Sequence, residues 1–473
     1  MNMQPPRYTT NEQAETPLVP SVAPLRLAAM TQQFAPSATL AMNEAVAQRR
    51  AAGRATIHLG FGEATFPLHP LLQSALADAA NHTGYAPVAG IAALRQAIAE
   101  YLSRTRGLNY SSDNIIVAPG SKPLLYALLH ILEGDVLLPV PSWVSYAPQA
   151  RLAGRRVIDV ATDPRDSHRL TPQALSKALI TARKEGANPR ILIVNSPSNP
   201  TGSMFESADV EAFTTWARNE GITIISDEIY AELAHSWREH VSPARFYAEG
   251  CIVTGGLSKA SSAGGWRLGY AALPPTPEGK QATKALRTLA SEIWSATTTP
   301  IQEAAVVAYT PNEELATYVR RSARVHAHVT GQLYTTLTNL GVPCPRPAGA
   351  FYLYPDFAPW RAVLNEKGIH TSQELAHYLL DEWDIATLPG VVFGEQPAAL
   401  RLRLATSMLY NPEGTYSAEE RNAKLWQLLA QADTLPPSSP ANETTLPLPA
   451  LSRAQAQFTE LVGHLNRPYR TGR

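Results

Sequence analysis

Several side chains of the kinds that enzymes use lie directly after short apolar runs in this chain. They comprise amines, a carboxylate, an amide, a phenol, an indole and a guanidinium group. Ligands of an α/β sheet bind beyond the carboxyl ends of its strands, so residues at these positions gather along one edge. Any one of them alone has an ordinary structural interpretation, such as a solvated lysine or an aspartate that ends a turn; only the ordered combination indicates a site. In chain order they are Ser121, Lys122, Trp143, Asn199, Asp227, Tyr230, Ser258, Lys259 and Arg267.

The elements that must position these side chains are short strands alternating with helices. The apolar runs are rich in branched side chains and are mostly bounded by Gly, Pro, Asn or Asp, which is typical of strands buried on both faces. Between them, apolar residues recur at helical spacing, as in 124–132 and 210–217, and the pattern at 298–339 predicts one extended helix or a kinked pair. The alternation predicts an α/β fold with a mostly parallel sheet covered by helices. The runs are 115–117, 136–140, 191–194, 222–225 and 252–254.

The two ends of the chain differ from its centre. Residues 1–25 are polar, contain five prolines and predict an arm without a core of its own. Residues 434–449 contain five prolines and one charged residue, which predicts a stiff linker. An amphipathic helix follows, with its apolar face at 458–465 and a candidate capping box at Ser452 and Gln455. This helix can dock on its own chain, or on a partner subunit where it would cover the mouth of the active site.

Composition excludes several classes of protein. The chain has 473 residues, with 40 Lys plus Arg balancing 40 Asp plus Glu, whereas a general nucleic-acid binder needs many cations to neutralise phosphates. No apolar stretch approaches the ~18 residues of a membrane span, and the N-terminus lacks the apolar segment of a signal peptide. The two cysteines, Cys251 and Cys344, fit a reducing compartment. We therefore expect a cytoplasmic protein without nucleic-acid or membrane partners.

Other catalytic signatures are missing from the sequence. There is no Gly-x-Ser-x-Gly run of a serine hydrolase and no Gly-x-x-x-x-Gly-Lys-Ser/Thr phosphate loop. The 12 histidines show no spacing typical of metal ligands, and we expect no metal site.

Motifs in order along residues 35–430 resemble the fold type I enzymes that use pyridoxal 5'-phosphate (PLP), specifically the class I/II aminotransferases. The resemblance implies the PLP-dependent transferase fold type I: a mostly parallel central sheet with flanking helices, plus a smaller α+β domain. It implies an arm at 1–25, a small domain from 26–60 and 336–433, a large PLP-binding domain at 61–335, and a proline-rich linker with a C-terminal helix at 434–473. The matching runs are LGFGE (59–63), YAPVAGIAALR (85–95), PGSK (119–122), NSPSNPTG (195–202), SDEIY (226–230), SK (258–259), GWR (265–267), PAGAFY (347–352) and LRLRLATS (400–407).

The same resemblance implies how the cofactor is held. Lys259 would form the Schiff base with the PLP aldehyde, and its freed amine would then move the α-proton. Asp227 would pair with the protonated ring nitrogen, a cation expected to lower the pKa of that carboxyl. Asn199 and Tyr230 would contact the ring hydroxyl oxygen, and Trp143 would stack on the ring. The residues implied at the phosphate are Gly120, Ser121, Lys122, Ser258 and Arg267.

The resemblance also implies substrate contacts and a dimer. Arg401 would bind the substrate carboxylate as a two-donor fork, with Arg403 ranked second, and Gly62 would offer its backbone. Tyr85 matches a tyrosine that crosses to the partner's phosphate, which implies a homodimer with shared active sites. Trp294 lies where transaminases of acidic substrates place an arginine from the partner subunit, and it suggests a larger or apolar substrate group.

Three functions follow from these residues. The first is an aminotransferase that moves an amino group from an α-amino acid to a 2-oxo acid. The second is a PLP-dependent lyase or synthase catalysing β- or γ-elimination, replacement or carbon–carbon bond formation, for example on S-adenosylmethionine. It is motivated by Ala64 and Thr65, which replace the usual Pro-Asp, and by the fact that a fold does not determine its reaction. The third, a transcription regulator, needs a DNA-binding domain that residues 1–25 are too short to form.

Overall fold

The computed structural model describes residues 37–235, 239–411, 416–435 and 448–467. The chain divides into two units, Met1–Ala35 and Pro36–Arg473, and the described residues all belong to the second. Within the described ranges, no helix is both long and apolar enough to cross a membrane. The predicted arm at 1–25 and most of the predicted linker, 436–447, lie outside the described residues.

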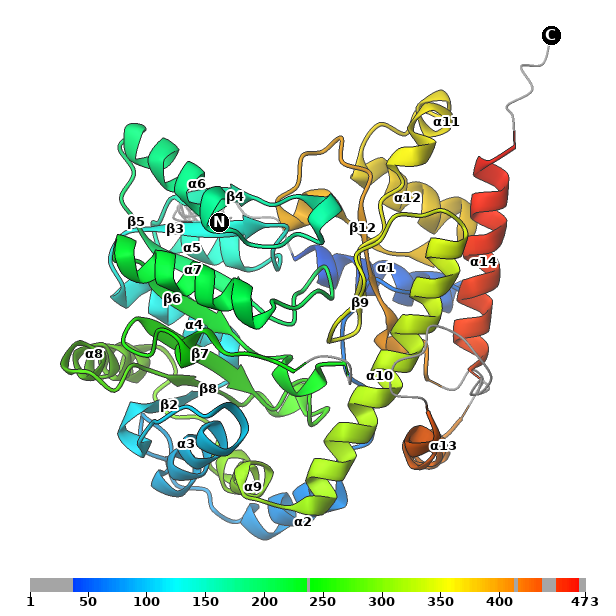
Figure 1. The fold of residues 1–473 in the computed structure, drawn as a ribbon. Helices are drawn as coiled ribbons and strands as arrows, with labels where there is room; N and C mark the ends of the chain where they lie inside the picture. Colours follow the sequence, from blue (N-terminus) through cyan, green and yellow to red (C-terminus); the bar gives the residue numbers. More distant parts are fainter. Residues whose placement is uncertain (1–36, 236–238, 412–415, 436–447, 468–473) are drawn as a thin grey trace, which may run out of the picture. The chain divides into compact units, whose positions relative to one another are not determined.

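The predicted apolar runs form a central sheet, which has seven strands within the described residues (Figure 1). All neighbouring strands are parallel except those that flank β8, which runs antiparallel between β2 and β7. The α/β fold with a mostly parallel sheet is therefore confirmed. The strands in spatial order are β2 (Ile115–Ala118), β8 (Gly269–Ala272), β7 (Cys251–Gly256), β6 (Thr223–Asp227), β5 (Pro189–Asn195), β3 (Asp135–Val140) and β4 (Val157–Ala161).

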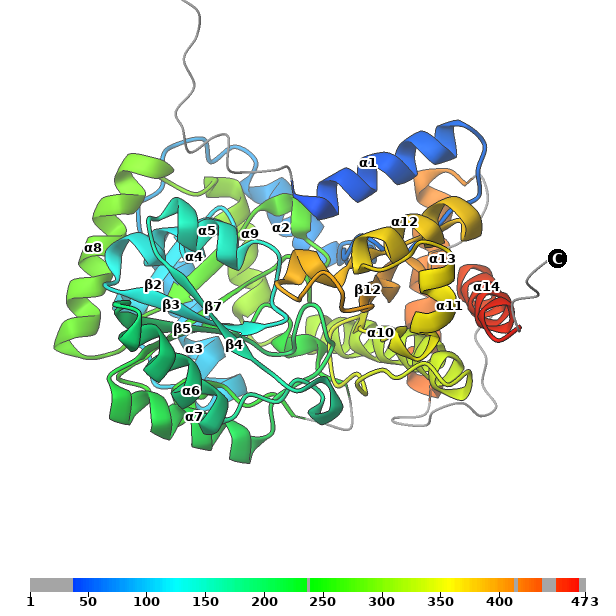
Figure 2. The same ribbon diagram turned by 90° about the horizontal axis from the view of Figure 1, so that it is seen from above.

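Helices cover both faces of this sheet, which explains why its strands are apolar on both sides. Figure 2 shows α4, α5 and α8 on one side and α6 and α7 on the other. The kinked pair predicted at 298–339 is present as α9 and α10, separated by a break around Asn312, the N-cap of α10. The helices around the sheet are α2 (Pro70–Ala79), α3 (Ala92–Arg106), α4 (Ser121–Ile131), α5 (Tyr146–Leu152), α6 (Pro172–Lys184), α7 (Ser207–Glu220), α8 (Pro277–Ile293) and α9 (Thr299–Tyr309).

A second group of elements surrounds two small sheets. Strand β1 (Ile57–His58) pairs with β10 (Ile385–Ala386), and β12 (Leu402–Ala405) lies between β11 (Leu388–Pro389) and β9 (Tyr352–Leu353). These strands share a hydrophobic core with the long helix α10. The proposed boundaries of the small and large domains stay a prediction. The helices of this group are α1 (Ala38–Ala51), α10 (Glu313–Asn339), α11 (Arg361–Glu366), α12 (Ser372–Trp383), α13 (Ala418–Gln431) and α14 (Pro449–Leu465).

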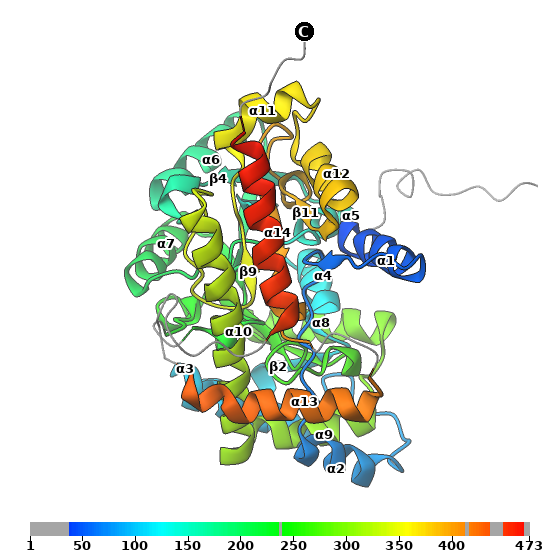
Figure 3. The same ribbon diagram turned by 90° about the vertical axis from the view of Figure 1, so that its right-hand side faces the viewer.

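The C-terminal helix α14 docks on its own chain, beside α10 (Figure 3). Phe458 and Leu461 are fully buried in the core that α10 and β1 share. The amide of Gln455 donates a hydrogen bond of 2.9 Å to the hydroxyl of Thr336 on α10. The helix begins at Pro449, four residues earlier than a cap at Ser452 predicts, and has no side-chain cap. The predicted capping box at Ser452 and Gln455 is therefore wrong. The alternative that this helix also covers a partner's active site stays a prediction.

Candidate active site

A cavity of about 400 Å³ opens at the carboxyl ends of the sheet strands. Its walls also include the start of α1, Tyr352 of β9 and Arg403 of β12, so both groups of elements contribute to it. Residues predicted from separate motifs thus meet in one place, as expected for an α/β sheet. The predicted residues that line the cavity are Gly62, Ser121, Lys122, Trp143, Asn199, Asp227, Tyr230, Ser258, Lys259 and Arg267.

Lys259 places its amine in the middle of this cavity. Its Nζ donates a hydrogen bond of 2.8 Å to the carbonyl oxygen of Gly62 and lies 5.7 Å from the ring centre of Tyr230. Desolvation lowers the pKa of Lys259 from 10.5 to about 8; Glu63 opposes this shift and Arg403 adds to it. A large fraction of the amine is therefore neutral, and nucleophilic, at mildly alkaline pH.

Asp227 ends the central strand β6 and is 3% exposed. Burial raises the pKa of its carboxyl to about 6, opposed by a hydrogen bond of 2.8 Å that the Tyr146 hydroxyl donates to Oδ2. Longer bonds of 3.4 Å reach Oδ1 from the Thr254 hydroxyl and the Ile229 amide. The expected lowering of this pKa needs a cation, and a protonated ring nitrogen would supply it.

Tyr146 is a site residue that the motif analysis missed. It begins helix α5, is 2% exposed and lies three residues after Trp143 in the loop that follows β3. The signal that could have found it is its place beyond the carboxyl end of a strand, where the other site residues also lie.

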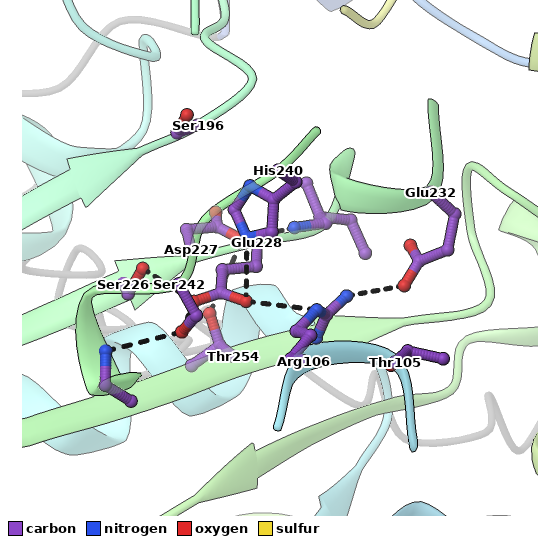
Figure 4. A network of polar contacts seen from close by, with 12 residues as sticks. Thr105, Arg106, Ser196, Ser226, Asp227, Glu228, Glu232, His240, Ser242 and Thr254 are labelled. Atoms are coloured by element: carbon purple, nitrogen blue, oxygen red, sulfur yellow. Dashed lines mark hydrogen bonds and ion pairs between the residues drawn. The ribbon is translucent and has the colours of Figure 1, made fainter. Parts of the chain in front are cut away.

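A buried ionic network lies directly behind Asp227 (Figure 4). Glu228 is 1% exposed and pairs with Arg106 at 3.3 Å and His240 at 3.1 Å, while the Ser226 and Ser242 hydroxyls donate hydrogen bonds to it. Burial alone would raise the pKa of Glu228, but the interactions with His240 and Arg106 lower it to about 2. The network holds the backbone that carries both Asp227 and Tyr230.

The start of helix α4 forms the other end of the cavity. Gly120 is its N-cap, with a φ of +98°, and a Cβ there would collide with the guanidinium of Arg267. Free backbone amides at a helix start together with a guanidinium suit a phosphate group. A Cβ at Gly256 would come within 2.6 Å of the Leu268 carbonyl oxygen, so the strand packing favours glycine. Ser258, by contrast, lines the cavity.

The two late arginines lie in different surroundings. Arg403 lines the cavity, is 2% exposed, and donates a hydrogen bond of 2.5 Å to the Gly60 carbonyl. Its Nε is buried without a partner among the described residues. Arg401 does not line the cavity: its guanidinium pairs with Asp356 at 2.9 Å and Glu395 at 2.6 Å. The structure thus gives no support to a substrate contact of Arg401, and that role stays a prediction. Both side chains point to one face, but Arg401 lies one strand repeat, roughly 7 Å, farther along, where two carboxylates neutralise it.

Two further predicted residues lie away from the cavity of their own chain. Tyr85 is 98% exposed, and Trp294 is half-buried at the end of α8. Neither lines the cavity. Their expected roles concern a partner subunit and stay predictions.

The residues present fit a PLP molecule. Asn199 is 5% exposed, and its side-chain oxygen is buried without a hydrogen-bond partner among the described residues. The Tyr230 hydroxyl lies 2.7 Å from the Tyr352 hydroxyl in the same wall. Orphaned polar atoms of this kind are rare in folded proteins and indicate a missing partner. An anionic group fits the phosphate end, and an aldehyde fits Lys259. In the described part of the chain no cluster of His, Cys, Asp and Glu is arranged to hold a metal ion.

Comparisons with known proteins agree with this geometry. The family model "Aminotransferase class I and II" matches residues 55–411. An aspartate aminotransferase of Geobacillus stearothermophilus is 36% identical over 393 residues, covering 81% of this chain and 95% of the relative. An aspartate/prephenate aminotransferase of Thermus thermophilus is 33% identical over 404 residues, covering 84% of this chain and 98% of the relative. The structure of the Thermus thermophilus aspartate aminotransferase with maleate superposes with a TM-score of 0.73 at 31% identity, covering 86% of this chain and all of that one.

The lowered pKa of Lys259 predicts how cofactor attachment depends on pH. Only the neutral amine attacks an aldehyde, so the rate at which PLP attaches to cofactor-free protein should rise with pH and level off above about 8. Visible absorbance of the attached cofactor, followed by stopped flow at a series of pH values, measures this rate. The Lys259→Ala variant is the control and should show no such phase. A rate that keeps climbing well above pH 8, as for an ordinary lysine, would contradict the prediction.

Proposed function

Because the chain belongs to the class I and II aminotransferase family, we propose that it transfers the amino group of L-aspartate to a 2-oxo acid. The enzyme is a PLP-dependent aminotransferase of fold type I. The comparisons favour this reaction over a lyase or synthase on the same fold. The names of the relatives reported above support aspartate as the amino donor.

The observation that carries the proposal is the surplus of cations in the cavity. Lys122, Lys259, Arg267 and Arg403 line it beside two carboxylates, Glu63 and Asp227, so that cations outnumber anions, and within the described residues none of the four cations forms an ion pair. Lys259 is reserved for the cofactor aldehyde, and Arg267 with the start of α4 suits the cofactor phosphate. Two cations then remain for a substrate, which fits a dicarboxylate better than an apolar amino acid. This substrate class replaces the apolar group that Trp294 suggested.

The α-carboxylate is assigned to Arg403. A buried guanidinium that keeps an unpartnered Nε offers the planar two-donor fork that a carboxylate needs. The aromatic rings of Tyr352 and Phe393 lie 5.1 Å and 5.5 Å from its Cζ and hold its plane. Lys122 is our candidate for the side-chain carboxylate. Its Nζ lies at the cavity surface, 5.2 Å from the ring centre of Trp143.

The remaining residues handle charge and protons. When bound, PLP supplies the electron sink that makes the α-proton of the amino acid acidic. Asp227 keeps an anion fixed at the end of β6, and Asn199 presents a buried amide. Lys259, once released from the cofactor, takes the α-proton at Nζ and returns it later. The buried rings of Phe351 and Tyr352 exclude water from this side of the amine.

The role of Lys122 predicts a change in specificity. Lys122→Met should lower kcat/KM for L-aspartate by about 10- to 100-fold, the range of a charge-assisted hydrogen bond, and change the value for L-alanine only slightly. Single-turnover half-reactions with L-aspartate and with L-alanine measure the two values of kcat/KM. An equal loss for the two amino acids, together with weaker PLP binding, would place Lys122 at the phosphate and contradict the assignment.

The two arginines predict a sharp contrast between matched variants. Arg403→Lys keeps the charge but loses the fork, so kcat/KM should fall about 100-fold or more for every amino acid while PLP still binds. Arg401→Lys is the control and should change kcat/KM only a few-fold, because its partners lie outside the cavity. Half-reaction kinetics and PLP titration of the purified variants decide between them. A larger fall in kcat/KM for the Arg401 variant than for the Arg403 variant would contradict our assignment.

We also propose a homodimer with shared active sites, in the cytoplasm. The exposure of Tyr85, a large aromatic side chain 98% accessible in the single chain, supports an interface there. Two free cysteines support a reducing compartment.

Shared sites predict that two inactive variants restore each other. Lys259→Ala and Tyr85→Ala should each be strongly impaired alone. Mixed after partial unfolding and refolding, they form hybrids in which one site has Lys259 from one chain and Tyr85 from the other. Steady-state activity should then recover to about a quarter of the wild-type value at equal mixing. Mixed samples no more active than the sum of the separate variants would show that each site is built from one chain.

A further inference from the structure

The loop that follows β3 brings two aromatic residues to the cofactor site as one unit. The backbone amide of Tyr146 donates a hydrogen bond of 3.1 Å to the Trp143 carbonyl oxygen, which closes a turn. Their rings meet edge to face, with centroids 5.2 Å apart and planes at 79°. Trp143 is the expected stacking platform for the cofactor ring. The position of the Tyr146 hydroxyl is therefore coupled to the position of that platform.

The hydroxyl of Tyr146 makes the shortest hydrogen bond to the Asp227 carboxylate. It lies 2.8 Å from Oδ2, against 3.4 Å for each of the two donors to Oδ1. Tyr146 is 2% exposed, so water does not compete for this bond. Burial, and the adjacent Asp227 charge, raise the pKa of the phenol well above 10. Tyr146 thus stays protonated and can only donate to the carboxylate.

A carboxylate in this position needs such a donor. Asp227 is buried, and the equally buried Glu228 next to it adds a second negative charge. Both features favour the neutral acid, which would be a poor partner for a protonated ring nitrogen. A hydrogen bond from an uncharged donor stabilises the anion without neutralising it, as a cationic partner would. The carboxylate therefore keeps its negative charge for the cofactor.

We propose that Tyr146 is a positioning residue of this aminotransferase, whose hydroxyl keeps Asp227 ionised and aligned so that the cofactor's ring nitrogen stays protonated. Tyr146 lines the cavity, and the role proposed for it acts through its hydrogen bond to Asp227. The inference rests on the proposed role of Asp227.

The experiment compares Tyr146→Phe with wild type in two measurements that do not depend on turnover. The first is the dissociation constant of PLP from the protein. The second is the ¹⁵N chemical shift of the ring nitrogen in bound, ¹⁵N-labelled PLP, which reports its protonation. Loss of the hydroxyl should weaken PLP binding by about 10- to 100-fold and move the shift toward the unprotonated value. Tyr110→Phe is the matched control, because the Tyr110 hydroxyl is buried without a partner among the described residues, and both readouts should stay unchanged.

Two further variants keep the test decisive. Difluorotyrosine at position 146 retains the ring and strengthens the donor, so PLP should bind more tightly and the shift should move toward the protonated value. Asp227→Asn should move the shift farther than Tyr146→Phe does. A wild-type shift and wild-type PLP affinity in Tyr146→Phe, with both changed in Asp227→Asn, would overturn the inference alone. An unchanged shift in Asp227→Asn would overturn the proposed role of Asp227 and the inference with it.

Discussion

The site depends on keeping one carboxylate charged where water cannot reach it. Asp227 ends the strand at the centre of the sheet, and burial raises its pKa to about 6 even with the hydrogen bonds that oppose this shift. An isolated buried charge is costly, so the surrounding residues are largely those that offset this cost. Tyr146 and Thr254 donate hydrogen bonds to the carboxylate, and Asn195 fixes its backbone carbonyl at 2.8 Å. In our proposal, the protonated ring nitrogen of bound PLP is the cation that pairs with Asp227.

The neighbouring Glu228 shows the opposite solution to the same problem. Its charge is fully paired inside the protein, by Arg106 and His240, and its pKa falls to about 2. Two successive carboxylates thus differ in their partners: Glu228 is held by ion pairs within the protein, and we propose that Asp227 is left for the cofactor. The late arginines divide in the same way. Arg401 is neutralised by two carboxylates, whereas Arg403 is buried against aromatic rings and one carbonyl.

Much of this arrangement could be predicted from the sequence, because the strands are coded by local composition. Runs such as Ile191–Val194 are branched and continuous, and the site residues follow them directly. Two strands of the sheet were not predicted from the sequence. The antiparallel β8 is Gly-Tyr-Ala-Ala, whose small residues carry little strand signal, and β4 at the sheet edge is interrupted by Asp159. Both form because neighbouring strands offer them hydrogen bonds, which local composition does not reveal.

The ranking of the two arginines is a different case. Arg401 and Arg403 are two residues apart on one strand, so periodicity gives them the same face and cannot rank them. What separates them is where Asp356 and Glu395 lie, and these come from a preceding segment and a loop. Tyr146 was missed for a similar reason, since its partner Asp227 is 81 residues away. Pairings of this kind are set by tertiary packing, which a single sequence does not display.

Helix α14 shows how an addition to this family's fold can influence the site without touching it. It lies beyond residue 411, where the family match ends, and packs on α10 through Phe458 and Leu461. On α10, His326 contacts the ring of Phe351, with centroids 4.8 Å apart. The Phe351 ring in turn lies 5.8 Å from the amine of Lys259. Since protein interiors are close-packed, α14 supports the wall behind the reactive lysine through two intervening layers. Its polar face is exposed, and none of its residues lines the cavity, so any effect of α14 on the site passes through this packing.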